Sequence, residues 1–429
     1  MWEGAGVQEP LTVFVEVTNT LAAPYTSGLQ RMTKRLVAAL ADPELNDGRL
    51  DVVALRWCRR HRTFRRLTDE EHHQLTAADD GAPETVGRVG GIGAPLRRSL
   101  RRVAALALLG RARGAIRSRR LPQAHPDLEI DSWPSGAVFL DVEAAWHNPR
   151  ARAELLPELA AAGVRTAVVV ADVLPETNPE WFETAPAALF RAHLGAHLRQ
   201  STLFLCISSA TETALREVAA RVGVHRELNC SVVTPGADLA SSGNAELPPM
   251  LEGRRIVLSV GTIEPRKGHR SMLDAFDLVS DEEPDLALVI VGRAGWHADE
   301  VVRRIVEHPR AGHQVFWLGQ VDDALLSTLY RRAFVAVAPS LSEGFGIPVV
   351  EALAAGVPVL ASRAGALTEA GGELAEYFEP GDAEELAELL RRHAGNDWWH
   401  ESRRRIVAGY KPPTWGDMAR QVVAALNPS

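Results

Sequence analysis

The chain has 429 residues, 46% of them hydrophobic and 24% charged, which is the composition of a globular protein long enough for two domains. Its formal net charge of −8 argues against a general nucleic-acid binder, so no nucleic-acid partner is expected. The sequence has no membrane span and no signal peptide at its start, and its cysteines (Cys58, Cys206 and Cys230) fit neither a metal site nor a disulfide framework, so we expect a cytoplasmic protein.

The first half of the chain alternates apolar strand-like runs with helical patterns, the order that builds a doubly wound α/β domain. Leu11–Val17 predicts the first strand, and a loop of small residues leads through Gly28 to a helix at Leu29–Leu40. Further strands are predicted at residues 50–55, 137–140, 166–170, 203–207 and 231–234, and helices at 150–162, 185–199 and 212–221. Residues 59–93 are polar and irregular, and we expect a long surface segment there.

Two features of this half allow more than one interpretation. The segment from Arg97 to Arg120 is rich in arginine and has no acidic residue. It predicts either an arginine-rich surface helix, which we favour, or a peripheral anchor on anionic lipid at the inner face of the plasma membrane. His193 and His197 lie four residues apart on a predicted helix, a spacing that suits a metal. No third ligand is evident nearby, so we expect ordinary helix residues and no metal.

The second half repeats the alternation after a linker-like stretch at Pro235–Pro249. Strands are predicted at residues 255–260, 286–291, 315–318, 333–338 and 357–361, and helices at 269–279, 301–307, 323–331, 384–392 and 415–426. The chain therefore divides into residues 1–240, residues 250–410 and a C-terminal segment, residues 411–429, that ends in a helix.

The loops after the strands of the second half suit a ligand with an anionic middle and hydroxyl groups on both sides. Open α/β sheets bind ligands at these strand ends. Arg266 and Lys267 would neutralise a diphosphate, and the glycine loop before the helix near Pro348 offers free N–H groups. Glu351 would accept hydrogen bonds from the hydroxyl groups of a ribose, and Glu343 would accept them from the hydroxyl groups of a sugar. The plainer alternatives are a solvated turn for the two cations and helix-start electrostatics for the two glutamates.

Two motifs of the second half resemble the donor site of glycosyltransferase family 4, retaining enzymes of the GT-B fold. They read VGTIEPRKGH at residues 260–269 and SEGFGIPVVEALAAGVPVLAS at residues 342–362, and their paired glutamates match the family's E-x7-E element. The first half agrees more loosely. TSGLQR at Thr26–Arg31 is similar to a glycine loop that faces the cleft, and Asp172 matches a motif that usually has His or Tyr where this chain has Ala171.

The resemblance implies two Rossmann-like domains that face a cleft, with the helix after Lys411 crossing back to the first domain. It also implies transfer of a hexose, with retention, from a nucleotide-diphosphate sugar to a glycan, lipid-linked or natural-product hydroxyl. GDP-mannose is the favoured donor and a UDP-sugar the next, with no other cofactor. No D-x-D motif is present, so we expect a metal-independent mechanism.

The catalytic candidates are Arg266, Lys267, Glu343 and Asp172, the last with the alternative role of a strand-end cap. The residues expected to bind the donor are Gly28, Gly261, Arg266, Lys267, Gly292, Leu318, Val321, Glu343, Gly344, Phe345, Gly346 and Glu351. Two other functions remain open. A non-catalytic partner subunit is compatible with Ala171, whereas a nucleotide-sugar 2-epimerase would lack this pairing of motifs.

Overall fold

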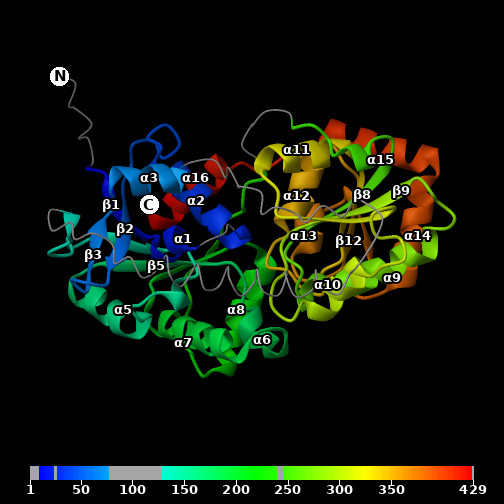
Figure 1. Cartoon of the computed structure of the whole chain (residues 1–429). Coiled ribbons are helices and arrows are strands. Elements are labelled where there is room, and N and C mark those ends of the chain that lie inside the picture. Colours follow the sequence, from blue (N-terminus) through cyan, green and yellow to red (C-terminus); the bar gives the residue numbers. More distant parts are fainter. Residues whose placement is uncertain (1–8, 24–26, 77–127, 239–244, 428–429) are drawn as a thin grey trace, which may run out of the picture.

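The computed structural model describes residues 9–23, 27–76, 128–238 and 245–427. These residues form two α/β domains, each built on one sheet with helices packed against it (Figure 1). The arginine-rich segment Arg97–Arg120 lies outside the described residues. Of the helices in the described ranges, none is long and apolar enough to cross a membrane.

The N-terminal sheet has seven strands in the order β3-β2-β1-β4-β5-β6-β7. All neighbouring pairs are parallel except β2 with β3. The central strands β1 and β4 are buried on both faces over most of their length, as is usual in parallel sheets. Val13 of β1 pairs in register with Val52 of β2 and Val138 of β4. The strands are β1 Leu11–Glu16, β2 Leu50–Cys58, β3 Thr63–Arg66, β4 Val138–Asp141, β5 Arg165–Val170, β6 Leu203–Cys206 and β7 Cys230–Val232.

The helices of this domain are α1 Thr18–Ala22, α2 Gly28–Ala41, α3 Asp69–Thr76, α5 Arg152–Ala161, α6 Leu174–Thr177, α7 Thr184–Gln200 and α8 Ser209–Arg221. The prediction of an irregular segment from residue 59 is wrong for its first part, which contains β3 and α3. The strand is stable because Phe64 is buried and because Arg65 forms an ion pair with Glu71 of α3, with 2.7 Å between Nη1 and Oε2.

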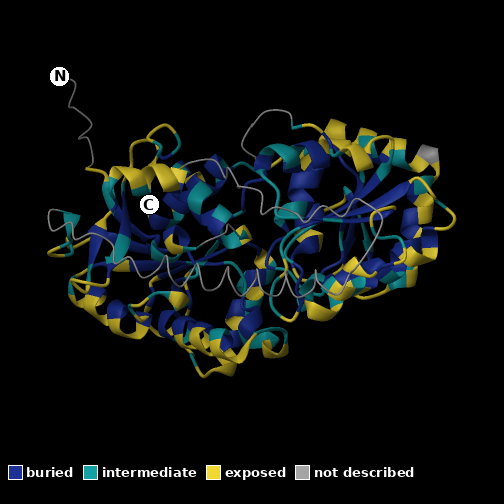
Figure 2. Cartoon of the chain, viewed as in Figure 1, coloured by how far each residue is buried: buried dark blue, intermediate teal, exposed yellow. Residues whose placement is uncertain are grey.

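The C-terminal sheet has six parallel strands in the order β10-β9-β8-β11-β12-β13. The strands are β8 Arg255–Val260, β9 Leu286–Val291, β10 Val315–Gly319, β11 Ala333–Ala338, β12 Val359–Ser362 and β13 Ala375–Phe378. The helices are α9 His269–Val279, α10 Asp299–Val306, α11 Asp323–Arg332, α12 Ile347–Ala354, α13 Leu367–Gly371, α14 Ala383–Ala394, α15 Asn396–Gly409 and α16 Trp415–Leu426. Figure 2 shows the strands buried inside and the outer helix faces exposed.

Helix α16 leaves the C-terminal domain and packs against α2 of the N-terminal one, so that red and blue helices lie together in Figure 1. Its first turn is fixed by the backbone N–H of Trp415, which donates to Asp238 at 2.8 Å. Its last turn is fixed by Arg165, whose guanidinium donates to the carbonyl of Leu426 at 3.0 Å. Helix α16 therefore completes the core of the N-terminal domain.

Strand order reverses once in each sheet, between β1 and β4 and between β8 and β11. Such switch points are where open α/β sheets bind ligands, at the carboxyl ends of the strands. Ala171, which follows β5, and Ser208, which follows β6, both contact Gly344, which follows β11. The carboxyl ends of the two sheets therefore meet each other across the domain boundary.

Candidate functional site

Glycines let the loops after β8, β9 and β11 approach one another at the C-terminal switch point. A Cβ atom on Gly292 would lie 1.9 Å from the carbonyl oxygen of Gly261, and one on Gly268 would lie 1.8 Å from that of Pro339. Gly292 and Gly268 also have φ angles of +145° and +67°, which other residues rarely adopt. Both the spacing and the backbone conformation thus require glycine at these two positions.

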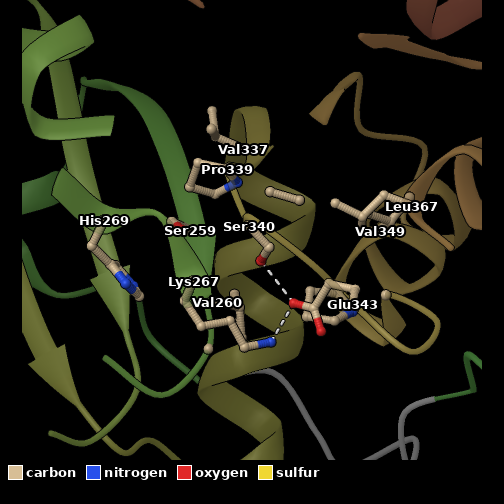
Figure 3. Close-up of a pocket in the computed structure, with 14 residues that line it drawn as sticks. Ser259, Val260, Lys267, His269, Val337, Pro339, Ser340, Glu343, Val349 and Leu367 are labelled. Atoms are coloured by element: carbon tan, nitrogen blue, oxygen red, sulfur yellow. Dashed lines mark hydrogen bonds and ion pairs between the residues drawn. The ribbon is translucent and has the colours of Figure 1, made fainter. Parts of the chain in front are cut away.

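Glu343 lies at the centre of a charged cluster at this switch point (Figure 3). Its carboxylate accepts from Nζ of Lys267, from Nη1 of Arg266 at 2.8 Å and from the hydroxyl of Ser340 at 2.7 Å. Arg266 also pairs with Glu264 at 2.7 Å. The two cations predicted from the EPRKG motif therefore meet the first predicted glutamate.

The charges of this cluster are fixed by the groups around them. Burial would raise the pKa of Glu343, but Lys267 and Arg266 outweigh this effect and lower the pKa to about 2. Burial would lower the pKa of Arg266, yet Glu343, Glu264 and Asp172 hold it above its usual range. At neutral pH the site therefore presents an ionised carboxylate beside a charged guanidinium.

Asp172 lies beside the Glu343 loop, which we define as residues 342–346. A Cβ atom on Gly344 of this loop would lie 3.1 Å from Cβ of Asp172. Burial raises the pKa of Asp172, while Arg266 and Lys267 act against that rise. Its carboxylate also accepts the backbone N–H of Leu174 at 3.1 Å. Asp172 thus has the geometry of a strand-end cap and is also close to the charged cluster.

Glu351, the second glutamate of the E-x7-E element, is held from both domains. It is 3% exposed on α12, where Oε1 pairs with the guanidinium of Arg31 from α2 and Oε2 accepts the hydroxyl of Tyr330 at 2.9 Å. Burial raises the pKa of Glu351, and Arg31 and Tyr330 oppose the rise. Both carboxylate oxygens therefore have protein partners, one of them from across the domain boundary.

The other residues expected to bind a donor fall into two groups. Leu318 and Phe345 are 8% and 4% exposed, with side chains in the hydrophobic core, and Val321 packs against that core. Gly28 and Gly346 have no side chain, so they could contact a ligand only through their backbone. A Cβ atom on Gly28 would meet no atom within 4 Å, whereas Gly346 has a φ of +107°. The structure brings Gly346 close to Lys267 and Glu343, since all three line one small pocket.

Sequence reasoning missed Ser340, Tyr330 and His269. Among the described residues, neither ring nitrogen of His269 has a hydrogen-bond partner, and burial, with a smaller effect of Lys267, lowers its pKa to about 3. His269 directly follows the EPRKG motif, so its position in the sequence was a usable signal. Tyr330 lies in an ordinary helical pattern, and only the fold reveals its contact with Glu351.

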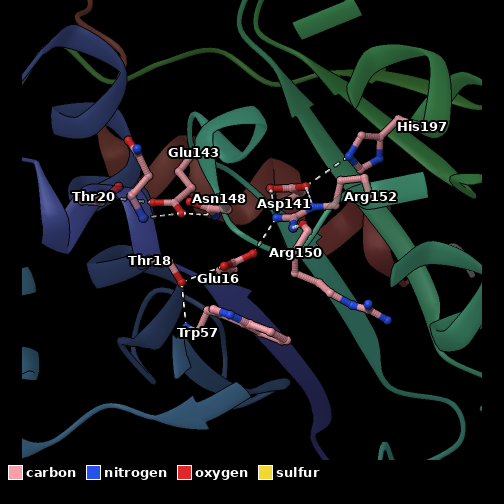
Figure 4. Close-up of polar contacts among 11 residues, drawn as sticks. Glu16, Thr18, Thr20, Trp57, Asp141, Glu143, Asn148, Arg150, Arg152 and His197 are labelled. Carbon is pink, nitrogen blue, oxygen red and sulfur yellow. Dashed lines mark hydrogen bonds and ion pairs between the residues drawn. The ribbon is translucent and has the colours of Figure 1, made fainter. Parts of the chain in front are cut away.

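A second polar cluster occupies the switch point of the N-terminal domain (Figure 4). Arg152 is fully buried and pairs with Glu16 at the end of β1 and with Asp141 at the end of β4, at 2.6 and 2.5 Å. His197 Nε2 lies 3.1 Å from the same Asp141 oxygen, and its Nδ1 lies 2.6 Å from the hydroxyl of Ser201. This network ties both strands at the switch point to α5 and α7.

The expectation that no third ligand lies near His193 and His197 is wrong. Asp141 offers one from β4, and the three ligand atoms lie within 4.8 Å of one another. The residues are distant in sequence, so only the fold brings them together. Asp141 already accepts from Arg152 and from His197, and burial lowers the pKa of both histidines. A neutral histidine pair beside an arginine–aspartate pair needs no cation to balance its charge, and the absence of a metal stays a prediction.

Residues 248–411 match the family model described as "Glycosyl transferases group 1". The serotype-specific mannosyltransferase WbdA of Escherichia coli is 29% identical over 260 residues, which are 56% of this chain and 32% of that protein. The O-antigen chain mannosyltransferase B of Escherichia coli is 29% identical over 265 residues, 59% of this chain and 68% of that protein. The chain therefore spans about a third of the length of WbdA.

A solved structure of Anabaena HepE in complex with UDP and glucose superposes with a TM-score of 0.54 at 15% sequence identity. The alignment covers 96% of this chain and 95% of that one, so both domains take part. Together with the two facing α/β domains, this likeness confirms the prediction of a GT-B fold.

Proposed function

Because residues 248–411 match the group 1 glycosyl transferases and the two described domains have the GT-B fold, we propose that the protein is a retaining glycosyltransferase. It moves a hexose from a nucleotide-diphosphate sugar to an acceptor hydroxyl. The observation that carries the proposal is the cluster of Arg266, Lys267 and Glu343 at the switch point, within the matched region.

The chemistry of the cluster suits a nucleoside diphosphate leaving group. Negative charge grows on the diphosphate as the glycosyl bond breaks, and fixed cations stabilise that charge without reorganising. Arg266 and Lys267 are such cations, and the bare backbone of Gly261 lines the same pocket as the Lys267 side chain. Glu343 is ionised at neutral pH and acts as an acceptor for sugar hydroxyls. We assign no protein nucleophile, and the leaving phosphate takes the acceptor proton.

The comparisons rank the substrates within this proposal. The two relatives are named mannosyltransferases, one of them for O-antigen chains, which favours GDP-mannose and a glycan or lipid-linked acceptor. The neighbouring structure holds UDP and glucose, which keeps a UDP-sugar as the second donor. A non-catalytic partner subunit is the second candidate function, because Ala171 replaces a polar side chain at the cleft.

Release of nucleoside diphosphate by the purified protein tests the proposal. We expect GDP release from GDP-mannose that increases when a glycan or lipid-linked acceptor is added. Binding of GDP and UDP, measured by titration calorimetry, shows which base is preferred. If the protein binds neither nucleotide and hydrolyses none of the GDP-, UDP-, TDP- or ADP-sugars, the glycosyltransferase assignment is wrong and the non-catalytic candidate takes its place.

Removing single charges tests the assigned donor site. Lys267→Ala and Glu351→Ala should each weaken nucleoside diphosphate binding, by about 10- to 100-fold for the loss of one charge-assisted hydrogen bond. Lys411→Ala is the matched control, since Lys411 is exposed in the segment before α16. Unchanged affinity in both site variants would place the nucleotide elsewhere.

A further inference from the structure

The Glu343 loop is held by two hydroxyl groups of the other domain. Ser208 and Thr211, at the start of α8, donate to the carbonyl oxygen of Gly344 at 2.6 and 2.9 Å. They are 0% and 3% exposed, and they are separated from Gly344 by more than a hundred residues of sequence. No contact within the loop itself could replace them, because the carbonyl points to the opposite domain.

The two hydrogen bonds fix the peptide group between Gly344 and Phe345, one residue after Glu343. A carbonyl oxygen has two acceptor positions, and here each receives one buried hydroxyl. On the far side of the same peptide group, Phe345 is anchored in the hydrophobic core. The orientation of Glu343 toward Arg266 therefore depends on contacts from the N-terminal domain as well as from its own.

Further contacts join the same surfaces of the two domains. Glu369 of α13 accepts the backbone N–H groups of Ser209 and Ala210 at 3.0 and 3.4 Å. Within the C-terminal domain, the backbone N–H of Ala366, at the start of α13, donates to the carbonyl of Glu343 at 3.1 Å. The first turn of α8 thus docks on the Glu343 loop and on the helix that supports it, and its hydrogen bonds to Gly344 and Glu369 require the domains to be closed.

We propose that Ser208 and Thr211 are positioning residues that give the Glu343 loop its reactive shape only when the two domains close. The inference rests on the proposed function of the Glu343 site. Arg266 and Lys267 belong to the C-terminal domain, so nucleotide binds without the two hydroxyls. Sugar transfer needs Glu343 in place, so turnover requires closure, and the donor is protected from hydrolysis in the open state.

Thr211→Val removes the hydroxyl and keeps the shape of the side chain. We expect kcat for nucleoside diphosphate release to fall about tenfold, as for one lost hydrogen bond to a buried carbonyl. The dissociation constant for the nucleoside diphosphate should change by less than about twofold. Thr211→Ser restores the donor and should recover most of kcat. Thr213→Val is the matched control, because the Thr213 hydroxyl bonds only to Ser209 within the same helix.

Amide hydrogen exchange of the peptide that contains the Glu343 loop gives a second readout. In the wild type, exchange should slow when donor is added, and Thr211→Val should lose most of that protection. Equal kcat and equal protection in Thr211→Val and wild type would overturn the positioning role and leave the proposed function intact. An equal loss of nucleotide affinity and kcat would also overturn it, because the role would then be structural. If the wild type binds no nucleotide, the proposed function itself fails.

Discussion

The two glutamates of the E-x7-E element are balanced by cations of different origin. Glu343 pairs with Arg266 and Lys267 of its own domain, whereas Glu351 pairs with Arg31 of the other. Motif spacing predicted the identities of the charged residues, because strand-end loops collect ligand-binding groups. It did not predict the pairing with Arg31, because that contact depends on how two separate domains close. The donor-binding roles stay predictions.

The pH dependence of stability should show the burial of His269. Its pKa is about 3 in the folded protein against 6.5 for a free histidine. As the pH falls, the unfolded chain therefore binds a proton at this histidine at a higher pH than the folded protein does. Stability from this group is therefore complete above the unfolded pKa and is lost as pH falls toward the folded one. When the pH falls from about 7 to about 5, the free energy of unfolding of the wild type should decrease by about 2 kcal/mol because of this histidine. The His269→Leu variant should not show that decrease.

Denaturant unfolding at the two pH values measures this difference. His269→Leu should be close to neutral at pH 7, since the ring nitrogens have no hydrogen-bond partner to lose within the part of the chain that the structure describes. His225→Leu, a change at an exposed histidine, is the control and should follow the wild type. A His269→Leu protein with the same pH dependence as the wild type would show that the ring is protonated in the folded state.

At the scale of helices and strands, the buried parallel core was predictable and the edges were not. The predicted bounds of β8, β9, β11 and α9 agree with the structure, because these segments are apolar on both faces or on one helical stripe. Strand β3 is short and basic, and α15 begins with charged and aromatic residues. Both depend on distant partners, as when Trp399 of α15 stacks on Phe334 at 5.6 Å.

Helix α16 should control the stability of the domain it joins rather than the one that precedes it. Met418 is fully buried in the core that contains Leu36 and Leu40 of α2. Met418→Ala should lower the free energy of unfolding by about 2 to 5 kcal/mol, through lost burial and a cavity. Calorimetry with separate domain transitions should place this loss in the N-terminal domain. Val407→Ala on α15, at a side chain 70% exposed, should have almost no effect.

At the scale of the whole molecule, the domains meet through contacts from several elements. Besides the bonds to Gly344, Trp296 donates to the carbonyl of Trp181 at 2.6 Å and stacks on Phe182 at 5.5 Å. Arg35 of α2 pairs with Asp323 of α11 at 3.0 Å. The contacts come from several loops, so closure is a property of the assembled molecule that no single motif predicts.

A methyl group at position 344 should prevent complete closure. A Cβ atom there would lie 1.8 Å from the carbonyl oxygen of Ala171, while the backbone of Gly344 lies outside the left-handed region and accepts alanine. Gly344→Ala should therefore fold. The ratio of its open to its closed population should rise about 10- to 100-fold, as expected for an overpacked contact.

Small-angle scattering should give Gly344→Ala a larger radius of gyration than the wild type, and nucleoside diphosphate release should slow in parallel. Gly409→Ala is the control, since a Cβ atom there meets nothing within 4 Å. A variant with wild-type scattering and wild-type turnover would mean that the loop moves aside at no cost and that closure does not depend on this contact.

The crossing of α16 also sets the order in which the molecule is completed during translation. The ribosome makes β1 to β7 first, yet the helix that covers α2 is synthesised after every strand of the second sheet. Domains usually fold in the order of their synthesis. Here the C-terminal sheet has all its strands before the N-terminal core has its last helix. The domain that begins the chain is thus the last to be finished, and a pause in translation before Trp415 leaves its core uncovered.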